Sequence, residues 1–414
     1  MRGGRGWCLA IVLVLVGFAE DAKAAPAEPP TVILISLDGT RPDDVTPETM
    51  PHLSGLTESG VSVDGLESVF PSNTFPAHVS LATGVTPQRH GLVNNGFEDS
   101  TGSVFEKKDP NIPRWIEVEP IWSILEGAGL PTASFHWVGS EGPWPPTGRG
   151  PSDWKPFDFK ISESQKVDQI LEWIDRPPES RPRLITAWFH GADGPGHRAG
   201  PGSASARRSL QKQDKQILRL LQELEKRDPG LVLTTVIFVS DHGMASATQT
   251  VNLSGVLGRD SKRGANDGVS TRIYGIGGFA SVVLAGKDAG NPQAAERVVE
   301  RARREGLEAY PRAAAPEDWR VDHPRFGDVV VRAPMGTAIV RPFLWIKGFH
   351  GYAPSDAEMQ AIFYAVGRGV KPGVRLGEAR AIDVAPTVLD LLDQPIPDWM
   401  EGRALNLQGT PSDL

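Results

Sequence analysis

The chain has 414 residues, which is enough for one large α/β domain with insertions or for two domains of ordinary size. Hydrophobic content of 39% and charged content of 23% are typical of a soluble globular protein and exclude a disordered or membrane-spanning chain. The formal net charge is −8 and no basic stripe offers a nucleic-acid surface. An anionic ligand must therefore be attracted locally, as bound cations can do.

The first 24 residues have the pattern of a secretory signal peptide. Arg2 and Arg5 precede an apolar run over residues 7–18, and residues 22–24 (AKA) supply a small-x-small cleavage pattern. The run is well short of the roughly 20 residues that span a bilayer, which disfavours an uncleaved anchor helix. We therefore predict an exported protein, periplasmic or secreted. Cys8, the only cysteine, is lost with the leader, so the mature chain has no disulfide.

After a short Pro/Ala linker at 25–30, residues 31–410 are predicted to form one catalytic domain. From 31 to about 250, strand-like and helix-like segments alternate, as a doubly wound sheet with helices on both faces requires. Helical spacing is clear at 166–174 and 210–224, and a closing helix is predicted from Ile382.

Two regions depart from this alternation. Residues 142–156 are rich in Pro, Gly and Trp, and we predict a surface loop near the site. From 252 to about 341 the glycines cluster, a strand-like ASVVLAG follows, and a helix is expected near 294–304. We interpret this second region as a smaller inserted α/β subdomain packed on the main sheet.

Three apolar runs of the main region end in acidic or imidazole side chains. TVILISLDG ends with Asp38, RLITAWFHGAD with Asp193, and TTVIFVSDHGM carries Asp241 and His242. Runs of this length between turn residues are typical of parallel strands that are covered on both faces. Ligands of open α/β sheets bind beyond the carboxyl ends of the strands. We therefore expect these side chains to meet in space.

Two further histidines complete this group. His197 follows Asp193 by four residues in a Gly/Pro loop, and His350 lies beyond the insertion. Oxygen and nitrogen ligands suit zinc or a similar divalent ion, and the absence of thiolates argues against a structural cysteine site. Asp241 and His242 alone would suit a turn with a capping aspartate. Their recurrence with other strand-end ligands favours a metal site.

Thr74 is the candidate nucleophile. It stands at the entry of an apolar, helix-like stretch, with Pro76 near the first-turn position that proline tolerates. A threonine hydroxyl needs a base or a metal before it attacks, and a helix N-terminus and a bound cation both favour its alkoxide. The alternative role is an N-cap, which is compatible with the first. His78, one turn further, is interpreted as a supporting residue rather than a base.

The motifs ISLDGTRPD, SNTFPAHVSLATGVTPQRHGLVNN, DGPGH, VSDHGM and FHGY occur in this order along the chain. With them the chain resembles the nucleotide pyrophosphatase/phosphodiesterase family of the alkaline phosphatase superfamily, over nearly the whole mature sequence. The resemblance implies an alkaline phosphatase-like α/β fold, whose central, mostly parallel sheet carries helices on both faces. The threonine in TFP is what narrows the superfamily to this family.

The resemblance also implies two Zn²⁺ per chain, although other divalent ions are possible. One would be held by Asp193, His197 and His350, and the other by Asp38, Asp241, His242 and the Thr74 oxygen. Ions roughly 4 Å apart can clamp a phosphoryl group. Thr74 would form a phospho-threonine intermediate that water then releases. Asn95 matches the family position that binds a non-bridging phosphate oxygen, whereas Asn94 fits less well; either could instead cap a turn.

Two aromatic residues are candidate substrate contacts. Phe75 follows the nucleophile, and Trp188 lies where the family commonly has a tyrosine facing the nucleobase. Two facing rings could stack a base, and stacking contributes on the order of 1–3 kcal/mol per base. Core packing is the alternative for each ring. Ala77 stands where relatives usually have Asn, which leaves the preferred leaving group open.

We therefore expect a hydrolase that cleaves nucleotide phosphodiester or pyrophosphate bonds and releases a nucleoside monophosphate. Its implied partner is a small-molecule substrate, with no protein partner and no membrane span after signal removal. One alternative keeps the metals and Thr74 but acts on phosphonoacetate or a choline phosphodiester. A non-catalytic, metal-stabilised binding protein is disfavoured because no ligand and no nucleophile is missing.

Overall fold

The computed structural model describes residues 28–258 and 268–409. The signal peptide predicted at residues 1–24, with its cleavage site, lies outside the described residues. None of the helices in the described part of the chain combines the length and apolar composition that a bilayer crossing requires.

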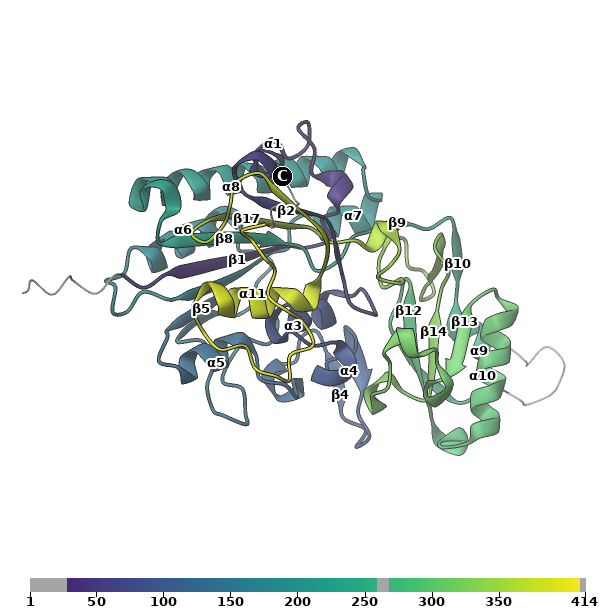
Figure 1. Cartoon of the computed structure of the whole chain (residues 1–414). Coiled ribbons are helices and arrows are strands. Elements are labelled where there is room, and N and C mark those ends of the chain that lie inside the picture. Colours follow the sequence, from purple (N-terminus) through teal and green to yellow (C-terminus); the bar gives the residue numbers. More distant parts are fainter. Residues whose placement is uncertain (1–27, 259–267, 410–414) are drawn as a thin grey trace, which may run out of the picture.

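An eight-stranded sheet forms the body of the molecule (Figure 1). Its strands lie in the order β18-β2-β17-β8-β1-β7-β5-β6, and only the pairs that β17 makes with β2 and β8 are antiparallel. The strands are β1 (Thr31–Leu37), β2 (Val61–Glu67), β5 (Thr132–Phe135), β6 (Asp153–Lys155), β7 (Leu184–Phe189), β8 (Thr234–Val239), β17 (Phe363–Gly367) and β18 (Val374–Arg380). The mostly parallel sheet that the sequence predicted is confirmed.

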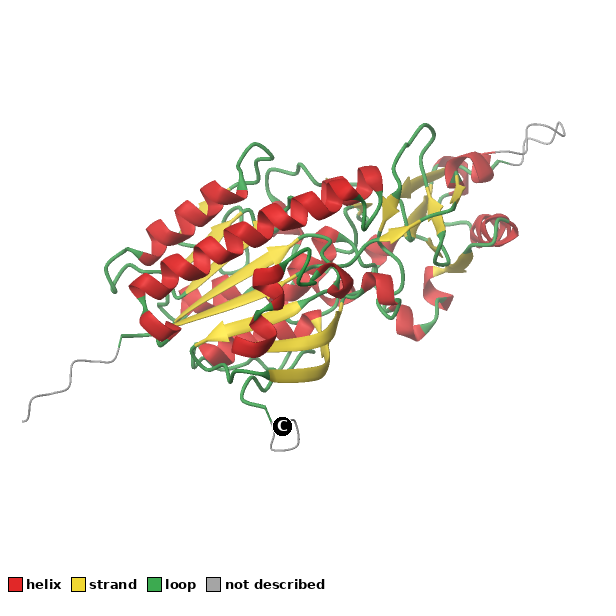
Figure 2. Cartoon of the chain, turned by 90° about the horizontal axis from the view of Figure 1, so that it is seen from above, coloured by secondary structure: helices red, strands yellow, loops and turns green. Residues whose placement is uncertain are grey.

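Helices cover both faces of this sheet, and α8 runs along one of them (Figures 1 and 2). On that face lie α1 (Pro51–Ser54), α2 (Leu56–Ser59), α6 (Glu163–Ile174) and α8 (Ala204–Arg227). On the other lie α3 (Thr74–Thr83), α5 (Ile121–Gly127) and α11 (Val384–Leu391), with α4 (Pro87–His90) beside α3. Alternate residues of β1 enter the two cores, Val32 on one side and Ile33 on the other, because side chains of a strand alternate between faces.

The helices that the sequence predicted are present and begin where their caps stand. Ser162 caps α6 and forms a capping box with Gln165, and Ser203 caps α8. The closing helix is α11, with Pro386 in its first turn. The expectation of a surface loop at 142–156 is wrong in part, because its last residues form the edge strand β6 and Trp144 is buried.

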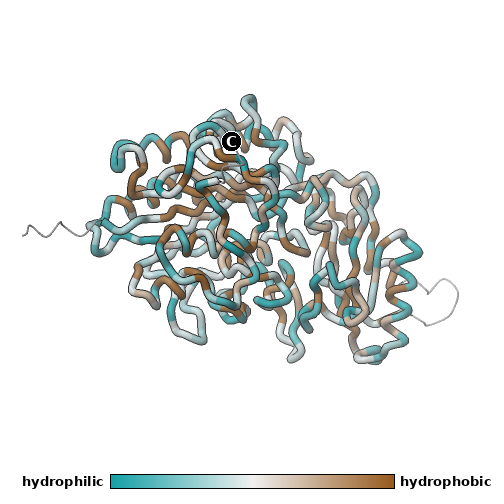
Figure 3. The backbone as a smooth tube through the Cα atoms, viewed as in Figure 1, coloured by the Kyte–Doolittle hydropathy of each residue, from teal (hydrophilic) through white to brown (hydrophobic). Residues whose placement is uncertain are grey.

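A second sheet follows β8 in the sequence. It is four-stranded and antiparallel, in the order β11-β12-β14-β13. Its strands are β11 (Thr271–Tyr274), β12 (Phe279–Leu284), β13 (Glu308–Pro311) and β14 (Val329–Arg332), and its helices are α9 (Leu253–Gly258) and α10 (Pro292–Arg304). It has a hydrophobic core of its own. Figure 3 shows hydrophobic residues along the strands of both sheets.

Short strand pairs make the remaining connections. They are β3 (Gly96–Glu98) with β4 (Val104–Glu106), β9 (Ala245–Ser246) with β16 (Gly348–Phe349), and β10 (Gln249–Val251) with β15 (Thr337–Ile339). The pair β9–β16 brings the chain that returns from the second sheet back to the end of β8.

Candidate metal centre

The carboxyl ends of three neighbouring strands form the floor of the site. β1 lies between β7 and β8 and is parallel to both, so the three strands end at the same edge of the sheet. Asp38 directly follows β1, and Asp241 comes two residues after β8. The backbone N–H of Gly39 donates to Asp241 Oδ1 at 3.1 Å, which fixes the two strand ends together.

Asp193 and His197 lie on a short helix, α7 (Asp193–Ala199), and not in the loop that the sequence predicted. Pro195 is the third residue of this helix, a position where its missing N–H leaves no intrahelical hydrogen bond unmade. Residues four apart on a helix share a face. The result is a distance of 3.3 Å between Asp193 Oδ1 and His197 Nε2.

His350 reaches the site directly after β16. Its backbone carbonyl accepts a hydrogen bond from the N–H of Gly278, and a Cβ on Gly277 would lie only 2.4 Å from the same carbonyl oxygen. Gly277 also has a φ of +80°, which favours glycine. Both the close contact and the backbone conformation therefore disfavour a residue with a side chain at this position. The glycine cluster of the second sheet thus lets that backbone pack against the His350 segment.

All three candidate histidine ligands are oriented in the same way. The Nδ1 atom of each lies within hydrogen-bond distance of a backbone carbonyl, which can only accept: His197 with Gly348 (2.8 Å), His242 with Gly243 (2.7 Å) and His350 with Ser72 (3.0 Å). Nδ1 must therefore carry the proton. This leaves the Nε2 lone pair for a metal, as in many histidine metal sites.

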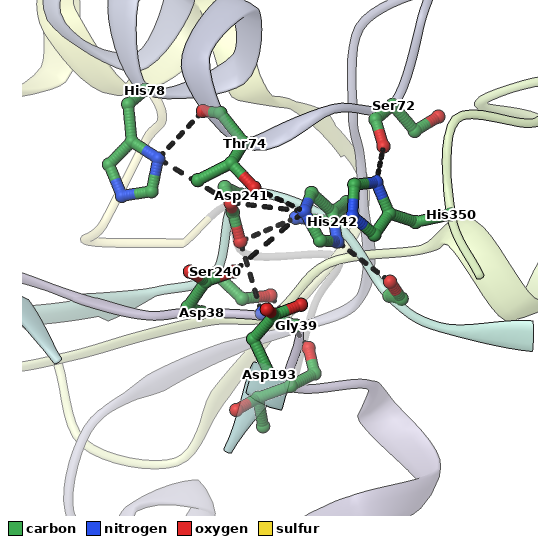
Figure 4. A network of polar contacts seen from close by, with 12 residues as sticks. Asp38, Gly39, Ser72, Thr74, His78, Asp193, Ser240, Asp241, His242 and His350 are labelled. Atoms are coloured by element: carbon green, nitrogen blue, oxygen red, sulfur yellow. Dashed lines mark hydrogen bonds and ion pairs between the residues drawn. The ribbon is translucent and has the colours of Figure 1, made fainter. Parts of the chain in front are cut away.

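The candidate ligands that Figure 4 labels, Asp38, Asp193, Asp241, His242 and His350, lie close to one another. In two groups the potential ligand atoms all lie within 4.8 Å of one another: Asp193, His197 and His350, and Asp38, Asp193 and His242. The first group has the composition predicted for one zinc. The second group contains Asp38 and His242 of the other predicted set. The second carboxylate of that set is close by, since Asp241 Oδ2 lies 3.2 Å from His242 Nε2.

The carboxylates have unused, buried oxygens. Asp38 Oδ1, Asp193 Oδ1 and Asp241 Oδ2 form no hydrogen bond with a described group. Burial, together with the charges of Asp241 and Asp193, raises the pKa of Asp38 well above its usual value. Leaving several carboxylates buried without cations is costly. The donor set and its unpaired oxygens therefore fit divalent cations.

Thr74 is the first residue of α3 and lies against this cluster. Its Oγ1 is 3.2 Å from His242 Nε2, and the residue is 4% exposed. The N-cap position belongs to Asn73, so the alternative role predicted for Thr74 is wrong. The hydroxyl lies at the positive end of a helix and beside the candidate ligands.

His78 supports the site from the next turn of α3. Its Nδ1 lies 2.8 Å from the carbonyl oxygen of Thr74 and 3.4 Å from Asp241 Oδ2. Burial lowers the pKa of this imidazole. Because it contacts the Thr74 backbone and not the hydroxyl, His78 has the geometry of a positioning residue.

Asn95 and Asn94 have different surroundings. Asn95 Oδ1 accepts the backbone N–H of Phe75 at 2.9 Å, which leaves its amide N–H groups for another acceptor. Asn94 Oδ1 accepts from Asn73 Nδ2 at 2.9 Å and from the backbone of Asn95 at 2.8 Å. Its own Nδ2 donates to the Tyr274 carbonyl at 3.4 Å. Asn94 is thus occupied inside the protein, and Asn95 is the residue with donors to spare.

A charged contact joins the second sheet to the β3–β4 strand pair near Asn94, and sequence reasoning missed it. Arg272 on β11 donates to both oxygens of Glu98 on β3, at 2.5 and 2.6 Å, and the Tyr274 hydroxyl donates to the same carboxylate at 2.9 Å. The Arg272 hydrogen bonds lower the pKa of Glu98, while burial and Glu98 raise that of Tyr274 to about 12. No sequence signal pairs residues so far apart.

The two candidate aromatic contacts do not form a parallel slot. The rings of Phe75 and Trp188 lie 6.5 Å apart at 86°, edge to face. Trp188 stacks instead on Phe157, at 4.7 Å and 27°, and its indole N–H donates to Asp38 Oδ2 at 3.0 Å. The expectation of two facing rings is therefore wrong. Phe157, which sequence reasoning also missed, is only half-buried and follows the segment that was interpreted as a loop.

Comparison with known proteins decides the family. The family model described as type I phosphodiesterase/nucleotide pyrophosphatase matches residues 32–353. The chain belongs to this family. It is therefore a member of a pyrophosphatase/phosphodiesterase family of hydrolases in the alkaline phosphatase superfamily, as the sequence motifs predicted.

Two curated relatives span most of the chain. An uncharacterized pyrophosphatase/phosphodiesterase of Schizosaccharomyces pombe is 31% identical over 393 residues, which are 88% of this chain and 77% of the relative. The bis(5'-adenosyl)-triphosphatase enpp4 of Xenopus laevis is 27% identical over 393 residues, covering 93% of this chain and 83% of the relative.

Solved structures of the family have the same fold. Human ectonucleotide pyrophosphatase/phosphodiesterase 5 superposes with a TM-score of 0.80 at 24% identity, over 91% of this chain and 98% of the other. An inactive threonine-to-alanine variant of the murine protein, in complex with AMP, gives a TM-score of 0.81 at 22% identity, over 92% and 99% of the two chains. These likenesses confirm the alkaline phosphatase-like α/β fold.

Proposed function

We propose that this member of the family hydrolyses nucleotide phosphodiester or pyrophosphate bonds through a phospho-threonine intermediate and releases a nucleoside monophosphate. The observation that carries the proposal is the position of Thr74, whose hydroxyl lies 3.2 Å from a candidate metal ligand. A hydroxyl so placed has no evident structural task, because it is not the cap of its helix.

Two cations, proposed to be Zn²⁺, would be held in this site. One would be held by Asp193, His197 and His350, and the other by Asp38, Asp241, His242 and Thr74. When bound, they would supply charge that stabilises the phosphoryl group and lowers the pKa of the threonine hydroxyl and of a water molecule. The stacked imidazoles of His242 and His350 support this assignment. The Nδ1 atom of each ring is bound to a backbone carbonyl, so the Nε2 atoms of both rings are left for a metal.

The protein groups perform the remaining tasks. Thr74 Oγ1 gives up its proton to solvent and forms a bond to phosphorus as the bond from phosphorus to the leaving oxygen breaks, and the departing alkoxide or phosphate takes the electron pair. The amide of Asn95 donates to a non-bridging oxygen of the phosphoryl group. Water then gives up a proton and attacks phosphorus, the bond from phosphorus to Thr74 Oγ1 breaks, and Oγ1 takes up a proton to restore the hydroxyl.

The nucleoside is proposed to lie beside Phe75 and Phe157. Trp188 is unsuited to stacking because Phe157 and His78 pack against it. Phe157 keeps a partly exposed ring for a flat base. Lys107, whose Nζ lies 5.8 Å from the Phe75 ring centroid, adds a positive charge for an anionic substrate. The AMP complex of the murine relative agrees with a nucleotide ligand.

A comparison of the wild type with Thr74→Ala and Thr74→Ser tests the proposal. The substrates are a thymidine monophosphate nitrophenyl ester, bis-nitrophenyl phosphate, nitrophenyl phosphate, phosphonoacetate and glycerophosphocholine. We expect the nucleotide diester to react fastest. Thr74→Ala should lose turnover while retaining zinc, and Thr74→Ser should keep part of the turnover. Chelation is expected to stop the wild type.

Several outcomes would contradict the proposal. Turnover by Thr74→Ala would rule out Thr74 as the nucleophile. Comparable rates on mono- and diesters would rule out a phosphodiesterase as the reaction class. A preference for phosphonoacetate or glycerophosphocholine would keep the chemistry and replace the substrate. Bound zinc without any turnover in the wild type would indicate a binding protein.

A further inference from the structure

The segment RPFLWIK at residues 341–347, called the aromatic loop below, exposes two large rings. Phe343 is 91% exposed and Trp345 is 90% exposed, more than the other large hydrophobic side chains in the described part of the chain. The residues that alternate with them, Leu344 and Ile346, are half-buried, and Ile346 packs against the core of the second sheet. The loop is therefore anchored through one set of side chains while the other set faces water.

The backbone of the aromatic loop is fixed at both ends. The N–H of Val340 donates to the backbone carbonyl of Val251 at 2.9 Å. The N–H of Lys347 donates to the backbone carbonyl of the candidate metal ligand His197 at 2.8 Å. Phe343 has a φ of +64°, a backbone conformation that is rare for a bulky residue. The exposure of the two rings thus belongs to a held conformation.

The charges at the ends of the loop point to the partner. Arg341 and Lys347 are both exposed, and neither forms an ion pair with a described residue. Aromatic rings flanked by cations match the interface of an anionic bilayer, where Trp and Phe settle at the headgroup level and Lys and Arg meet lipid phosphates.

The size of the patch argues against a protein partner. Two aromatic side chains bury about 150–250 Å² each, whereas a stable protein interface buries about 800 Å² on each partner. Insertion of two rings into a headgroup layer needs no larger surface. A bilayer is therefore the occupant that this loop fits best.

We propose that the aromatic loop docks this protein on anionic membrane surfaces, with Phe343 and Trp345 entering the headgroup layer and Arg341 and Lys347 contacting lipid phosphates. The hydrogen bond between Lys347 and His197 ties the loop to the metal centre, so docking would bring that centre close to the bilayer. The docking itself does not depend on the proposed function.

Co-sedimentation with vesicles tests the docking. The purified protein is mixed with vesicles of phosphatidylcholine alone or with phosphatidylserine added. We expect the wild type to bind the anionic vesicles. The aromatic double variant Phe343→Ala/Trp345→Ala should bind at least about tenfold more weakly. In the variant Arg341→Gln/Lys347→Gln, vesicle binding should no longer depend on salt or on phosphatidylserine. The matched control Trp154→Ala/Val232→Ala removes exposed hydrophobic side chains elsewhere and should bind as the wild type does.

Two results would overturn the proposal: no binding of the wild type to either vesicle, or equal binding by the aromatic double variant. Sedimentation velocity without lipid completes the test. If the aromatic double variant changes only the oligomeric state, a second copy of the chain is the partner that binds the aromatic loop, and the proposal fails. Turnover of a soluble diester should be the same in all these variants, which keeps the outcome separate from that of the proposed function.

Discussion

Single residues near the metal centre have roles that depend on what lies against them. Trp188 stands at a sequence position where an aromatic ring suggested a base contact. In the fold, its indole N–H donates to Asp38 at 3.0 Å and Phe157 covers its ring. The residue therefore holds a candidate ligand in place. The motif could predict an aromatic ring, but ring orientation depends on packing that the sequence does not display.

The variant Trp188→Phe separates these roles. It retains an aromatic ring and removes the hydrogen bond to Asp38, so zinc affinity should fall, by about tenfold or more, as for other groups that orient metal ligands. The relative rates on different nucleotides should remain as in the wild type. Competition with a chelator measures the affinity, and Trp154→Phe at the exposed edge strand is the control. A change of base preference with unaltered zinc affinity would contradict this role.

At the scale of elements, the end of the central sheet was the most predictable part. Strands such as β1, β7 and β8 are continuous apolar runs, and a parallel sheet puts their ends at one edge, so Asp38 and Asp241 could be placed together in advance. Helix α7 was missed because Gly194 and Pro195 are typical of loops. The contact of β3 with β11 was missed because it joins residues 174 apart, Glu98 and Arg272.

Arg272→Gln tests whether the second sheet positions the nucleophile helix. The substitution leaves the nearly buried Glu98 without its ion pair and loosens Tyr274, whose carbonyl holds Asn94. Because small displacements of positioning groups are costly, we expect kcat to fall by about tenfold with little change in KM or zinc content. Arg297→Gln, which removes the Asp288 pair elsewhere in the same subdomain, is the control. An equal loss in both variants would indicate general destabilisation.

At the scale of the whole molecule, neutral histidines that are buried or half-buried link stability to pH. Burial lowers the pKa of His90 and of His136 to about 3 and that of His190 to about 4. A group whose pKa is lower in the folded than in the unfolded state takes up a proton on unfolding. Its contribution to stability is therefore complete above the unfolded value of about 6.5 and is lost as the pH falls towards the folded value. Glu141 acts in the opposite sense, because burial raises its pKa to about 7.

We expect the free energy of unfolding to fall between pH 6.5 and pH 4.5. Each such histidine contributes at most about 1.4 kcal/mol per pH unit. Urea denaturation across this range measures the dependence, and His90→Asn should show a shallower one than the wild type. His52→Asn is the control, since the side chain of His52 is 38% exposed. Identical pH dependence in the wild type and His90→Asn would contradict the assignment.

Two cations are proposed to lie around Thr74, and anomalous diffraction at the zinc edge would detect them. Crystals of the purified protein supplied with zinc should show two peaks. One should lie among Asp193, His197 and His350, and the other among Asp38, Asp241, His242 and the Thr74 oxygen. Zinc at neither position, or a single ion that leaves the Thr74 hydroxyl without contact, would rule out a two-cation centre at Thr74.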